Sequence, residues 1–320
     1  MRVFTDSAQD IREIAELLLR GEVVAIPTET VYGLAANALN PEAVKEIYRI
    51  KGRPSHNPLI AHIHDPAIAG DYVRLNATAE RLIDAFWPGP LTLVLPKTPI
   101  IPGIVTAELP TLAIRMPDHP LMLSVLKQLG RPIAAPSANP SNYISPTRVE
   151  HVIQGLEGRL KYVLDGKSCA RGVESTILNV CDPAHIKLLR PGPITLEQIE
   201  TVIGMKVETG SIKTLSASVL TSPGQMKSHY RPHTPLTIGK STQSEPIAYV
   251  HFSQSGDYSP MEGHYFLTRQ LDSREAEANL YDLLQKLDRA NYREIVFDPV
   301  PEGENWNAIR DRLARASCRD

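Results

Sequence analysis

Apolar residues in the first part of the chain follow two spacings, one typical of amphipathic helices and the other of buried strands. Ile11, Ile14, Ala15 and Leu18 recur at helical spacing, and Gly21 follows as a helix stop. Short apolar runs bounded by proline or polar residues predict buried strands. These runs span residues 23–26, 59–63, 91–96, 111–117, 131–135, 162–164, 177–180 and 186–189. Strands that alternate with helical segments predict an α/β fold.

The pattern weakens after about Met205 and resumes before the C-terminus. Residues 206–235 are rich in Ser, Thr, Pro and Gly and weakly periodic, which indicates a linker. Beyond it, strands are predicted at residues 247–252, 264–268 and 294–297, and helices at 280–287 and 306–316. We therefore expect a first domain over residues 1–205, a linker over residues 206–235 and a small α/β domain over residues 236–320.

The composition is that of an ordinary globular protein. The chain has 320 residues, of which 42% are hydrophobic and 22% charged, enough for two domains with buried cores. Its net charge of -2 provides no general attraction for nucleic acid. No apolar run approaches the length of a membrane span, and the N-terminal residues lack a signal-peptide pattern. Cys169, Cys181 and Cys318 form no CxxC pair, which fits a reducing cytosol and argues against a zinc or disulfide scaffold.

Two proline-bracketed stretches carry residues suited to a phosphate-bearing ligand. In the first, Lys51 and Arg53 stand on either side of a glycine, and Asn57 follows; in the second, Ser137 and Asn139 flank an alanine. The cations can neutralise phosphate charge, while the hydroxyl and amide groups can fix orientation. The alternative for Lys51 and Arg53 is a solvated surface pair.

The helix that begins at Asn40 favours a buried role for Lys51. Val44, Ile47, Tyr48 and Lys51 fall on one face of this helix, and three of them are apolar. A lysine on a buried face needs an anionic partner, because an unpaired buried cation is costly. We therefore expect Lys51 to point into a cavity.

Two further features suggest a ligand at strand ends. The loop of residues 27–34 is dense in hydroxyl groups and follows a predicted strand directly, as ligand-binding loops of α/β folds often do. Arg115 projects from another strand, opposite Leu112 and Ile114, and an arginine there can hold a carboxylate with two parallel hydrogen bonds. The alternatives are an ordinary turn and a salt bridge at the rim.

Other common sites are not predicted. His56, His62 and His64 match no zinc spacing and no cysteine or carboxylate cluster joins them, so no metal ligand is expected. The chain has no G-x-x-x-x-G-K-[ST], no G-x-G-x-x-G and no G-x-S-x-G. A nucleotide would therefore bind without a Walker loop or a Rossmann fingerprint.

The candidate residues lie within six ordered motifs: PTETVYGL, KGRPSHNPLI, LAIRMPDHP, APSANPSN, GVESTI and LRPG. In order and spacing, these motifs resemble the YrdC-like threonylcarbamoyl-AMP synthases over about residues 20–195. The linker sequence SPGQMKSHYRP and the second α/β domain resemble the long, two-domain form of that family. The resemblance implies a YrdC-like twisted sheet with helices around a large open cavity, followed by a smaller Rossmann-like α/β C-terminal domain.

The resemblance also implies an activity. The family makes L-threonylcarbamoyl-AMP and pyrophosphate from L-threonine, bicarbonate or CO2, and ATP, with Mg2+ on the nucleotide. The product supplies the threonylcarbamoyl group placed on the adenosine beside the anticodon of tRNA. The expected partners are these substrates and the downstream tRNA threonylcarbamoyl transferase proteins, with a weak tRNA contact and no membrane. The expected location is the cytoplasm.

The family's site residues carry over to positions of this chain. Threonine would be held by Thr30, His62, Arg115, Ala135 (through its backbone) and Ser175. ATP would be held by Arg53, Asn57, Thr111, Ser137, Ser145, Arg190 and Tyr230. The catalytic Lys-x-Arg/Ser-x-Asn signature maps to Lys51, Arg53, Ser137 and Asn139, with no metal ligand. No side chain is assigned as a general base.

The linker keeps part of the family pattern. His229, Tyr230 and Pro232 hold their positions, whereas residues 225–228 read Gln-Met-Lys-Ser where some relatives have Met-Lys-Tyr-Arg. A passive tether has no need of a tyrosine in such a setting. We therefore predict that residues 206–235 fold over the cavity as a lid when ATP and threonine bind; the alternative is a tether that grazes the surface.

Two other functions compete with this prediction. One is a carbamoyl-adenylating module like those of hydrogenase maturation, which carry zinc-finger parts that a chain without CxxC lacks. The other is a non-enzymatic RNA-binding module, to which a net charge of -2 and 6% aromatic residues lend little support. Pyrophosphate release that requires both threonine and bicarbonate separates the three.

Overall fold

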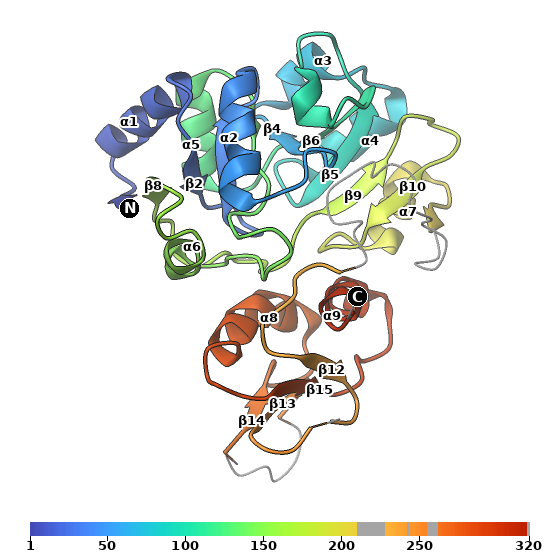
Figure 1. Cartoon of the computed structure of the whole chain (residues 1–320). Helices are drawn as coiled ribbons and strands as arrows, with labels where there is room; N and C mark the ends of the chain where they lie inside the picture. Colours follow the sequence, from blue (N-terminus) through green and yellow to red (C-terminus); the bar gives the residue numbers. More distant parts are fainter. Residues whose placement is uncertain (210–227, 242, 255–261, 319–320) are drawn as a thin grey trace.

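The computed structural model describes residues 1–209, 228–241, 243–254 and 262–318, and it shows two bodies, each built around its own sheet (Figure 1). The first sheet has the strand order β1-β8-β2-β3-β7-β4-β6-β5-β9-β10-β11, and the second has the order β12-β15-β13-β14. The α/β fold predicted from the hydrophobic pattern is confirmed.

The first body contains every strand that the sequence pattern predicted for it. Its strands are β1 (Arg2–Phe4), β2 (Val24–Ile26), β3 (Gly33–Asn37), β4 (Ile60–His62), β5 (Leu91–Pro96), β6 (Thr111–Arg115), β7 (Ile133–Ala134), β8 (Tyr162–Leu164), β9 (Thr176–Asn179), β10 (Lys187–Arg190) and β11 (Glu208–Thr209). Its helices are α1 (Ala8–Leu19), α2 (Pro41–Lys51), α3 (Ala69–Tyr72), α4 (Ala77–Phe86), α5 (Pro120–Leu129), α6 (Val149–Gly155) and α7 (Leu196–Ile203), with 3-10 turns η1 (Pro66–Ile68) and η2 (Gly103–Thr106).

Strands β1, β3 and β11 were not predicted, and each lacks a strong apolar run. β1 has three residues and β11 has two exposed ones, while β3 is made mostly of small residues. β3 pairs with β2 and with β7 on its other side, so that pairing partners rather than its own composition make it a strand. β11 pairs with β10, which extends the first sheet into the predicted linker.

Helices cover both faces of the first sheet. Successive side chains of a strand point to opposite faces, so neighbouring residues of one strand pack with different helices. Val24 and Ile26 of β2 pack with α1 and α5 in one core cluster. Ala25 between them belongs to a second cluster, which contains residues of α2, α4, α6 and α7. The central strands are therefore buried on both sides.

Helix α2 carries the Lys51–Arg53 stretch to its position. Asn40 caps its start, accepting hydrogen bonds from the backbone N–H groups of Glu42 and Ala43 at 3.1 and 3.3 Å. Gly52 ends the helix with φ +62°, a left-handed conformation that glycine adopts without steric cost. The turn places Lys51 on the helix and Arg53 in the loop that follows.

The second body is the small α/β domain that the sequence predicted. Its strands β12 (Leu236–Ile238), β13 (Ile247–His251), β14 (His264–Phe266) and β15 (Glu294–Phe297) are all parallel. Its helices are α8 (Ser273–Leu287) and α9 (Asn307–Ala316), preceded by the 3-10 turn η3 (Glu304–Trp306). Both helices lie between the small sheet and the first body (Figure 1).

The two bodies share a hydrophobic core. Val31, Ile144 and Val173 of the first body pack in one cluster with the buried residues of α8 and α9. Tyr230, which follows the undescribed residues 210–227, belongs to the same cluster. The second domain is therefore seated on loops of the first rather than held by a tether alone.

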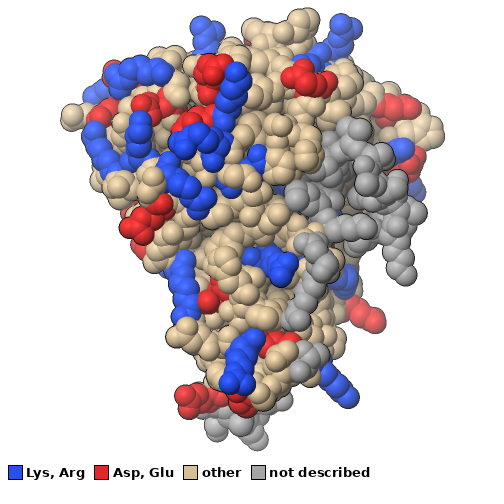
Figure 2. Space-filling model, viewed as in Figure 1, with Lys and Arg blue, Asp and Glu red and all other residues tan. Residues whose placement is uncertain are grey.

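The visible surface carries no single field of charge. On the face shown in Figure 2, Lys and Arg side chains are interspersed with Asp and Glu. Several form pairs, including Lys45–Glu42 and Arg49–Glu46 on α2. No described helix combines the length and apolar character that a membrane span requires.

Candidate active site

A pocket lies where several strands of the first sheet end. His62 and Arg115 end the parallel strands β4 and β6 and stand opposite one another in register. Arg190 ends β10, beside the start of β9. The predicted site residues that line the pocket are Thr30, Arg53, His62, Arg115, Ala135, Ser137, Ser175, Arg190 and Tyr230.

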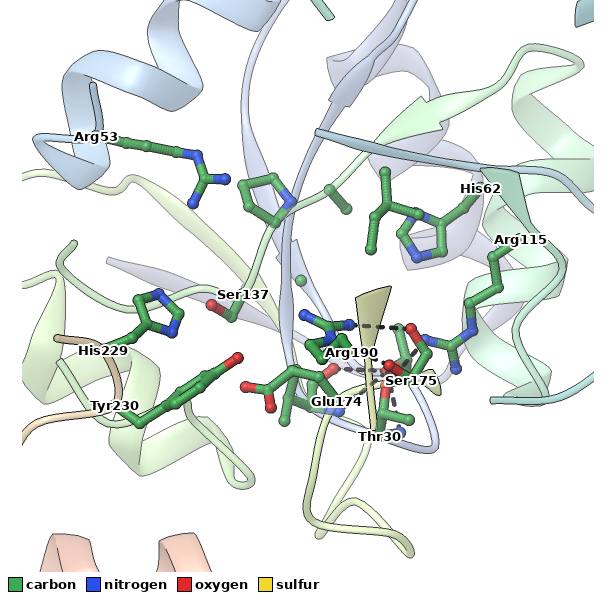
Figure 3. Close-up of a pocket in the computed structure, with 16 residues that line it drawn as sticks. Thr30, Arg53, His62, Arg115, Ser137, Glu174, Ser175, Arg190, His229 and Tyr230 are labelled. Carbon is green, nitrogen blue, oxygen red and sulfur yellow. Dashed lines mark hydrogen bonds between the residues drawn. The ribbon is translucent and has the colours of Figure 1, made fainter. Parts of the chain in front are cut away.

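The labelled side chains form two groups (Figure 3). The first, which we call the Arg115 end, consists of Thr30, His62, Arg115 and Ser175. The second, the Tyr230 end, consists of Arg53, Ser137, His229 and Tyr230. Arg190 and Glu174 lie between them in the view of Figure 3.

Arg115 is fixed on three sides. Its Nε donates to the carbonyl oxygen of Gly89 at 3.0 Å, and its Nη1 donates to Oγ1 of Thr30 at 3.1 Å. Its Nη2 forms an ion pair with the carboxylate of Glu29, which is itself buried. Arg115 is only 3% exposed, and these contacts hold its guanidinium in the pocket wall. A group of this kind is suited to a carboxylate ligand.

The hydroxyl-rich loop after β2 folds around Thr28. The Oγ1 of Thr28 donates to the carbonyl oxygen of Val31 at 2.7 Å and accepts from the N–H groups of Thr30 and Val31 at 3.2 Å. It also shares a hydrogen bond of 2.8 Å with Oγ1 of Thr30. This turn directs the Thr30 hydroxyl toward Arg115.

His62 is a buried neutral imidazole. Burial, followed by the neighbouring Arg115 cation, lowers the pKa of His62 to about 3. Its Nδ1 has no hydrogen-bond partner among the described residues. A neutral ring with a free nitrogen at the pocket wall can bond to a polar group of a ligand.

Arg53 and Arg190 supply positive charge along the pocket. Arg53 donates from Nε to the carbonyl oxygen of Asn57 at 3.2 Å and from Nη2 to that of Pro58 at 3.0 Å. Burial lowers the pKa of Arg53 to about 10, so that it remains a cation at neutral pH. Arg190 donates from Nε and Nη2 to the carbonyl oxygen and Oγ of Ser175, at 3.0 and 3.1 Å. Both guanidinium groups are thereby held in place for an anion.

Tyr230 reaches the pocket from the C-terminal side of the undescribed segment. Its φ of +61° lies in the left-handed region, which a tyrosine rarely adopts. Its ring stacks on Tyr281 with centroids 5.8 Å apart and lies 5.1 Å from the guanidinium carbon of Arg312. The hydroxyl group has no partner among the described residues. His229 packs against it edge to face, and burial lowers the pKa of His229 well below its usual range.

Glu174 lines the pocket and was not predicted as a site residue. Its carboxylate accepts from Oγ of Ser145 at 2.6 Å, from the Tyr281 hydroxyl at 3.0 Å and from Nε of Arg312 at 2.8 Å. Burial alone would raise its pKa, but the Arg312 cation, then Arg190 and the Ser145 hydrogen bond, lower the pKa of Glu174 to about 2. It is therefore a carboxylate at neutral pH, with both oxygens already bonded.

Two residues of the Lys-x-Arg/Ser-x-Asn signature line the pocket, and the other two hold a pocket loop in place. Arg53 and Ser137 line the pocket, whereas Lys51 and Asn139 do not. Lys51 donates from Nζ to the carbonyl oxygens of Ser137 and Asn139 at 2.5 and 2.6 Å. The amide of Asn139 donates to the carbonyl oxygens of Pro140 and Tyr143, both at 2.8 Å. Lys51 and Asn139 thus hold the Ser137 loop in shape.

Asn57, Ser145 and Thr111 also lie outside the pocket wall. Asn57 supports Arg53 through its carbonyl oxygen, and Ser145 supports Glu174 through its hydroxyl. Thr111 begins β6, at the opposite end of the strand from Arg115. Thr111, predicted to hold ATP, is therefore separated from Arg115 by the length of β6.

Sequence reasoning missed Glu29, Glu174 and His229 as parts of the site. Glu29 and Glu174 stand inside the motifs PTETVYGL and GVESTI, beside hydroxyl residues that were chosen. Their signal was a single acidic residue among uncharged residues, because a buried carboxylate needs a cation as partner. Arg312 gave a weaker signal, a charged residue on the same helical face as Ile309, Leu313 and Ala316.

The lid prediction falls partly outside the described residues. Residues 210–227 are not described, while His229 and Tyr230 are, and both line the pocket. Among the residues that the structure describes, no group of three or more His, Cys, Asp or Glu side chains is placed to hold a metal ion.

Two family models match the chain. The Sua5/YciO/YrdC model, described as telomere recombination, matches residues 16–192. A model described as threonylcarbamoyl-AMP synthase, C-terminal domain, matches residues 194–318.

Curated proteins and solved structures agree with these models. The threonylcarbamoyl-AMP synthase of Bacillus subtilis is 42% identical over 331 residues, which cover 96% of this chain and 92% of the relative. That of Pyrococcus abyssi is 38% identical over 325 residues, covering 96% and 94%. A crystal structure of P. abyssi Sua5 complexed with L-threonine matches with a TM-score of 0.90 at 35% identity, covering 99% of this chain and 98% of that one. The resemblance inferred from the six motifs is confirmed.

Proposed function

The chain belongs to the threonylcarbamoyl-AMP synthase family, and we propose that its pocket joins L-threonine, bicarbonate or CO2, and ATP into L-threonylcarbamoyl-AMP and pyrophosphate. The observation that carries the proposal is one pocket whose two ends differ in chemistry. A fixed guanidinium, hydroxyl groups and a neutral imidazole meet at the Arg115 end, while cations and an aromatic ring meet toward the Tyr230 end.

We propose that threonine binds at the Arg115 end. Its carboxylate would pair with Arg115, whose buried guanidinium lines the pocket, because charge-assisted pairs are the strong ones. Its hydroxyl group would bond to Thr30 or to the free Nδ1 of His62. Its amine would lie near the backbone of Ala135, which also lines the pocket.

We propose that ATP binds toward the Tyr230 end. Arg53 and Arg190 would neutralise phosphate charge, and the Ser137 hydroxyl would orient a phosphate oxygen. The Tyr230 hydroxyl and the His229 ring would contact the nucleotide and close this end of the pocket. Lys51 and Asn139 would act through the Ser137 loop.

The proposed reaction has two steps. The neutral amine of threonine adds to CO2 and loses a proton, which gives a carbamate. A carbamate oxygen then bonds to the α-phosphorus of ATP while the bond from that phosphorus to the β-phosphate oxygen breaks, and pyrophosphate leaves. Such a transfer depends on positioning and charge neutralisation more than on a covalent nucleophile.

Mg2+ is proposed to arrive as part of the nucleotide. The pocket carboxylate, Glu174, has both oxygens bonded to Ser145, Tyr281 and Arg312, so it does not offer a free ligand for a metal. The ATP phosphates themselves supply the oxygen ligands that Mg2+ prefers. The chain's own contribution is the positive charge of Arg53 and Arg190.

The product is proposed to pass to tRNA threonylcarbamoyl transferase proteins in the cytoplasm, with at most a weak contact between this chain and tRNA. A mixed anhydride of a carbamate and a phosphate reacts readily with nucleophiles. A reaction that consumes it must therefore follow closely, and a closed pocket would protect it from water.

Pyrophosphate release tests the proposed function. We expect release from the purified full-length chain only when ATP, threonine and bicarbonate are all present, and at the same rate from Arg148→Gln, whose side chain lies on the surface. Release with carbamoyl phosphate in place of threonine and bicarbonate would favour the carbamoyl-adenylating alternative. RNA binding without pyrophosphate release would favour a binding module.

A further inference from the structure

The second domain contacts Glu174, a residue that lines the pocket, through two side chains. Arg312 of α9 and Tyr281 of α8 both bond to Oε2 of Glu174, at 2.8 and 3.0 Å. Arg312 is 1% exposed on its side chain and Tyr281 is fully buried. Nη2 of Arg312 also donates to the carbonyl oxygen of Glu174, at 3.4 Å. A pocket residue of the first domain is thus held by the second.

Arg312 is itself held by neighbouring residues of α9. Its Nη1 donates to Asp311 at 2.7 Å, and Asp311 accepts from Nε of Arg315 at 2.9 Å. The carbonyl oxygen of Arg315 accepts from the backbone N–H of His229 at 3.4 Å. Two cations and two carboxylates therefore form one buried, charge-balanced chain that runs from α9 to the pocket. Such pairs are retained only where their geometry is satisfied on all sides.

The same two side chains hold Tyr230. The Tyr230 ring lies with the Arg312 guanidinium over it at 5.1 Å and the Tyr281 ring stacked on it at 5.8 Å. A tyrosine in a left-handed backbone conformation persists only if its surroundings support it. Arg312 and Tyr281 provide that support.

Glu174 also has an electrostatic consequence for the pocket. After Arg312, the cation that most lowers the pKa of Glu174 is Arg190, which lines the pocket and is proposed to neutralise phosphate charge. A carboxylate released toward Arg190 would both occupy that cation and repel an anionic ligand. By binding Glu174, Arg312 and Tyr281 therefore leave Arg190 available for an anionic ligand.

We propose that Arg312 and Tyr281 are positioning residues of the nucleotide site, through which the C-terminal domain sets Glu174, Tyr230 and the charge that ATP meets. This role rests on the proposed function. It gives the second domain a specific task at the active site, and it predicts that damage to these contacts weakens ATP binding while threonine binding is spared.

Tyr281→Phe tests the proposal with the smallest change. It removes one hydrogen bond to a buried carboxylate and keeps the ring that stacks on Tyr230. We expect the KM for ATP to rise roughly 10-fold and the KM for threonine to stay within about 2-fold. The control is Tyr143→Phe, which removes another hydrogen bond between the domains, to Asp288 at 2.6 Å and outside the pocket wall. This variant should leave both constants unchanged.

A double-mutant cycle tests whether Arg312 acts through Glu174. Arg312→Gln alone leaves a buried carboxylate without its cation, so we expect a larger loss of ATP binding than in Tyr281→Phe. Adding Glu174→Gln removes the stranded charge, and the double variant should bind ATP better than Arg312→Gln alone, measured by calorimetry. Additive losses in the cycle would overturn the role through Glu174.

The outcomes separate this proposal from the function on which it rests. If the unmodified chain releases no pyrophosphate with ATP, threonine and bicarbonate, the proposed function fails. If the unmodified chain is active but Tyr281→Phe matches Tyr143→Phe, or if Tyr281→Phe raises the KM for threonine as much as that for ATP, only the positioning role fails.

Discussion

The Arg115 end and the Tyr230 end of the pocket are built in different ways. The Arg115 end uses residues at strand ends and in loops of the first domain alone, each held by its close neighbours in one sheet. The Tyr230 end joins a loop of the first domain to His229 and Tyr230, and rests on Arg312 and Tyr281 of the second. One end is therefore complete once the first sheet has formed, whereas the other needs both domains.

The difference bears on how each end can change. Groups at the ends of hydrogen-bonded strands can move little without breaking the sheet, which suits recognition of a small ligand of fixed shape. Groups contributed by a segment between domains can move with those domains. ATP, the larger of the two proposed ligands, is therefore assigned to the end that both domains build.

The largest expected effect is at the Arg115 end. Arg115→Ala removes the buried guanidinium proposed to hold the threonine carboxylate, at a cost on the order of 2–5 kcal/mol. We expect the KM for threonine to rise about 30-fold or more and that for ATP to change little, measured by pyrophosphate release. The same rise in both constants would contradict the division of the pocket into two ends.

Tyr230→Ala probes the other end. If Tyr230 contacts the nucleotide, its loss should cost about 1–3 kcal/mol of ATP binding, the size of an aromatic contact with a base. The KM for ATP should then rise about 5- to 150-fold, while Tyr230→Phe, which keeps the ring, should lose less. A selective loss of threonine binding would show that the two ends have been assigned the wrong way round.

Lys51→Ala tests the support beneath the pocket. The carbonyl oxygens of Ser137 and Asn139 would lose their donor, which should lower the free energy of unfolding by about 1–3 kcal/mol. We expect turnover to fall as well, because the Ser137 loop would no longer be held. Lys45→Ala, an exposed lysine on the same helix, is the control for thermal unfolding and kinetics. Normal turnover in Lys51→Ala would mean that the loop does not depend on this lysine.

Both ends should also give the folded chain a pH-dependent stability. His62 has a pKa of about 3 in the folded chain against an ordinary value of 6.5, so the unfolded chain binds its proton first as the pH falls. Stability should therefore be lost from about pH 6.5 downward, by up to about 1.4 kcal/mol per pH unit for this residue. His62→Gln should reduce that slope in denaturant titrations at pH 7, 6 and 5.

His229→Gln should reduce the same slope, because burial also lowers the pKa of His229. An unchanged slope in both buried variants would show that neither histidine is held neutral in the folded chain.

Much of the Arg115 end could be predicted from the sequence. Alternation along β6 placed Arg115 on the face opposite Leu112 and Ile114. The hydroxyl-rich loop after β2 was visible in the sequence itself. The start at Asn40 and the apolar spacing of Val44, Ile47 and Tyr48 marked the helix that carries Lys51. These are local rules of strand and helix geometry, which hold wherever the segment is placed.

What Lys51 does could not be predicted in the same way. Its burial followed from the helical pattern, but its partners are backbone carbonyl oxygens of a loop more than eighty residues away, rather than a ligand. Carbonyl groups are present in every residue, so no sequence pattern distinguishes these two. Only the packing of the Ser137 loop on α2 decides them.

The sequence by itself determined the α/β class, most strand positions, the family and the residues at strand ends, because hydrophobic spacing and short motifs act within a few neighbouring residues. The tertiary structure alone decided that Glu174 is bonded to Arg312 and Tyr281 and that Tyr230 is packed between them. Those contacts join segments over a hundred residues apart along the chain for Glu174, and about fifty to eighty for Tyr230. Their energy depends on burial and distance, which exist only after the two domains have docked.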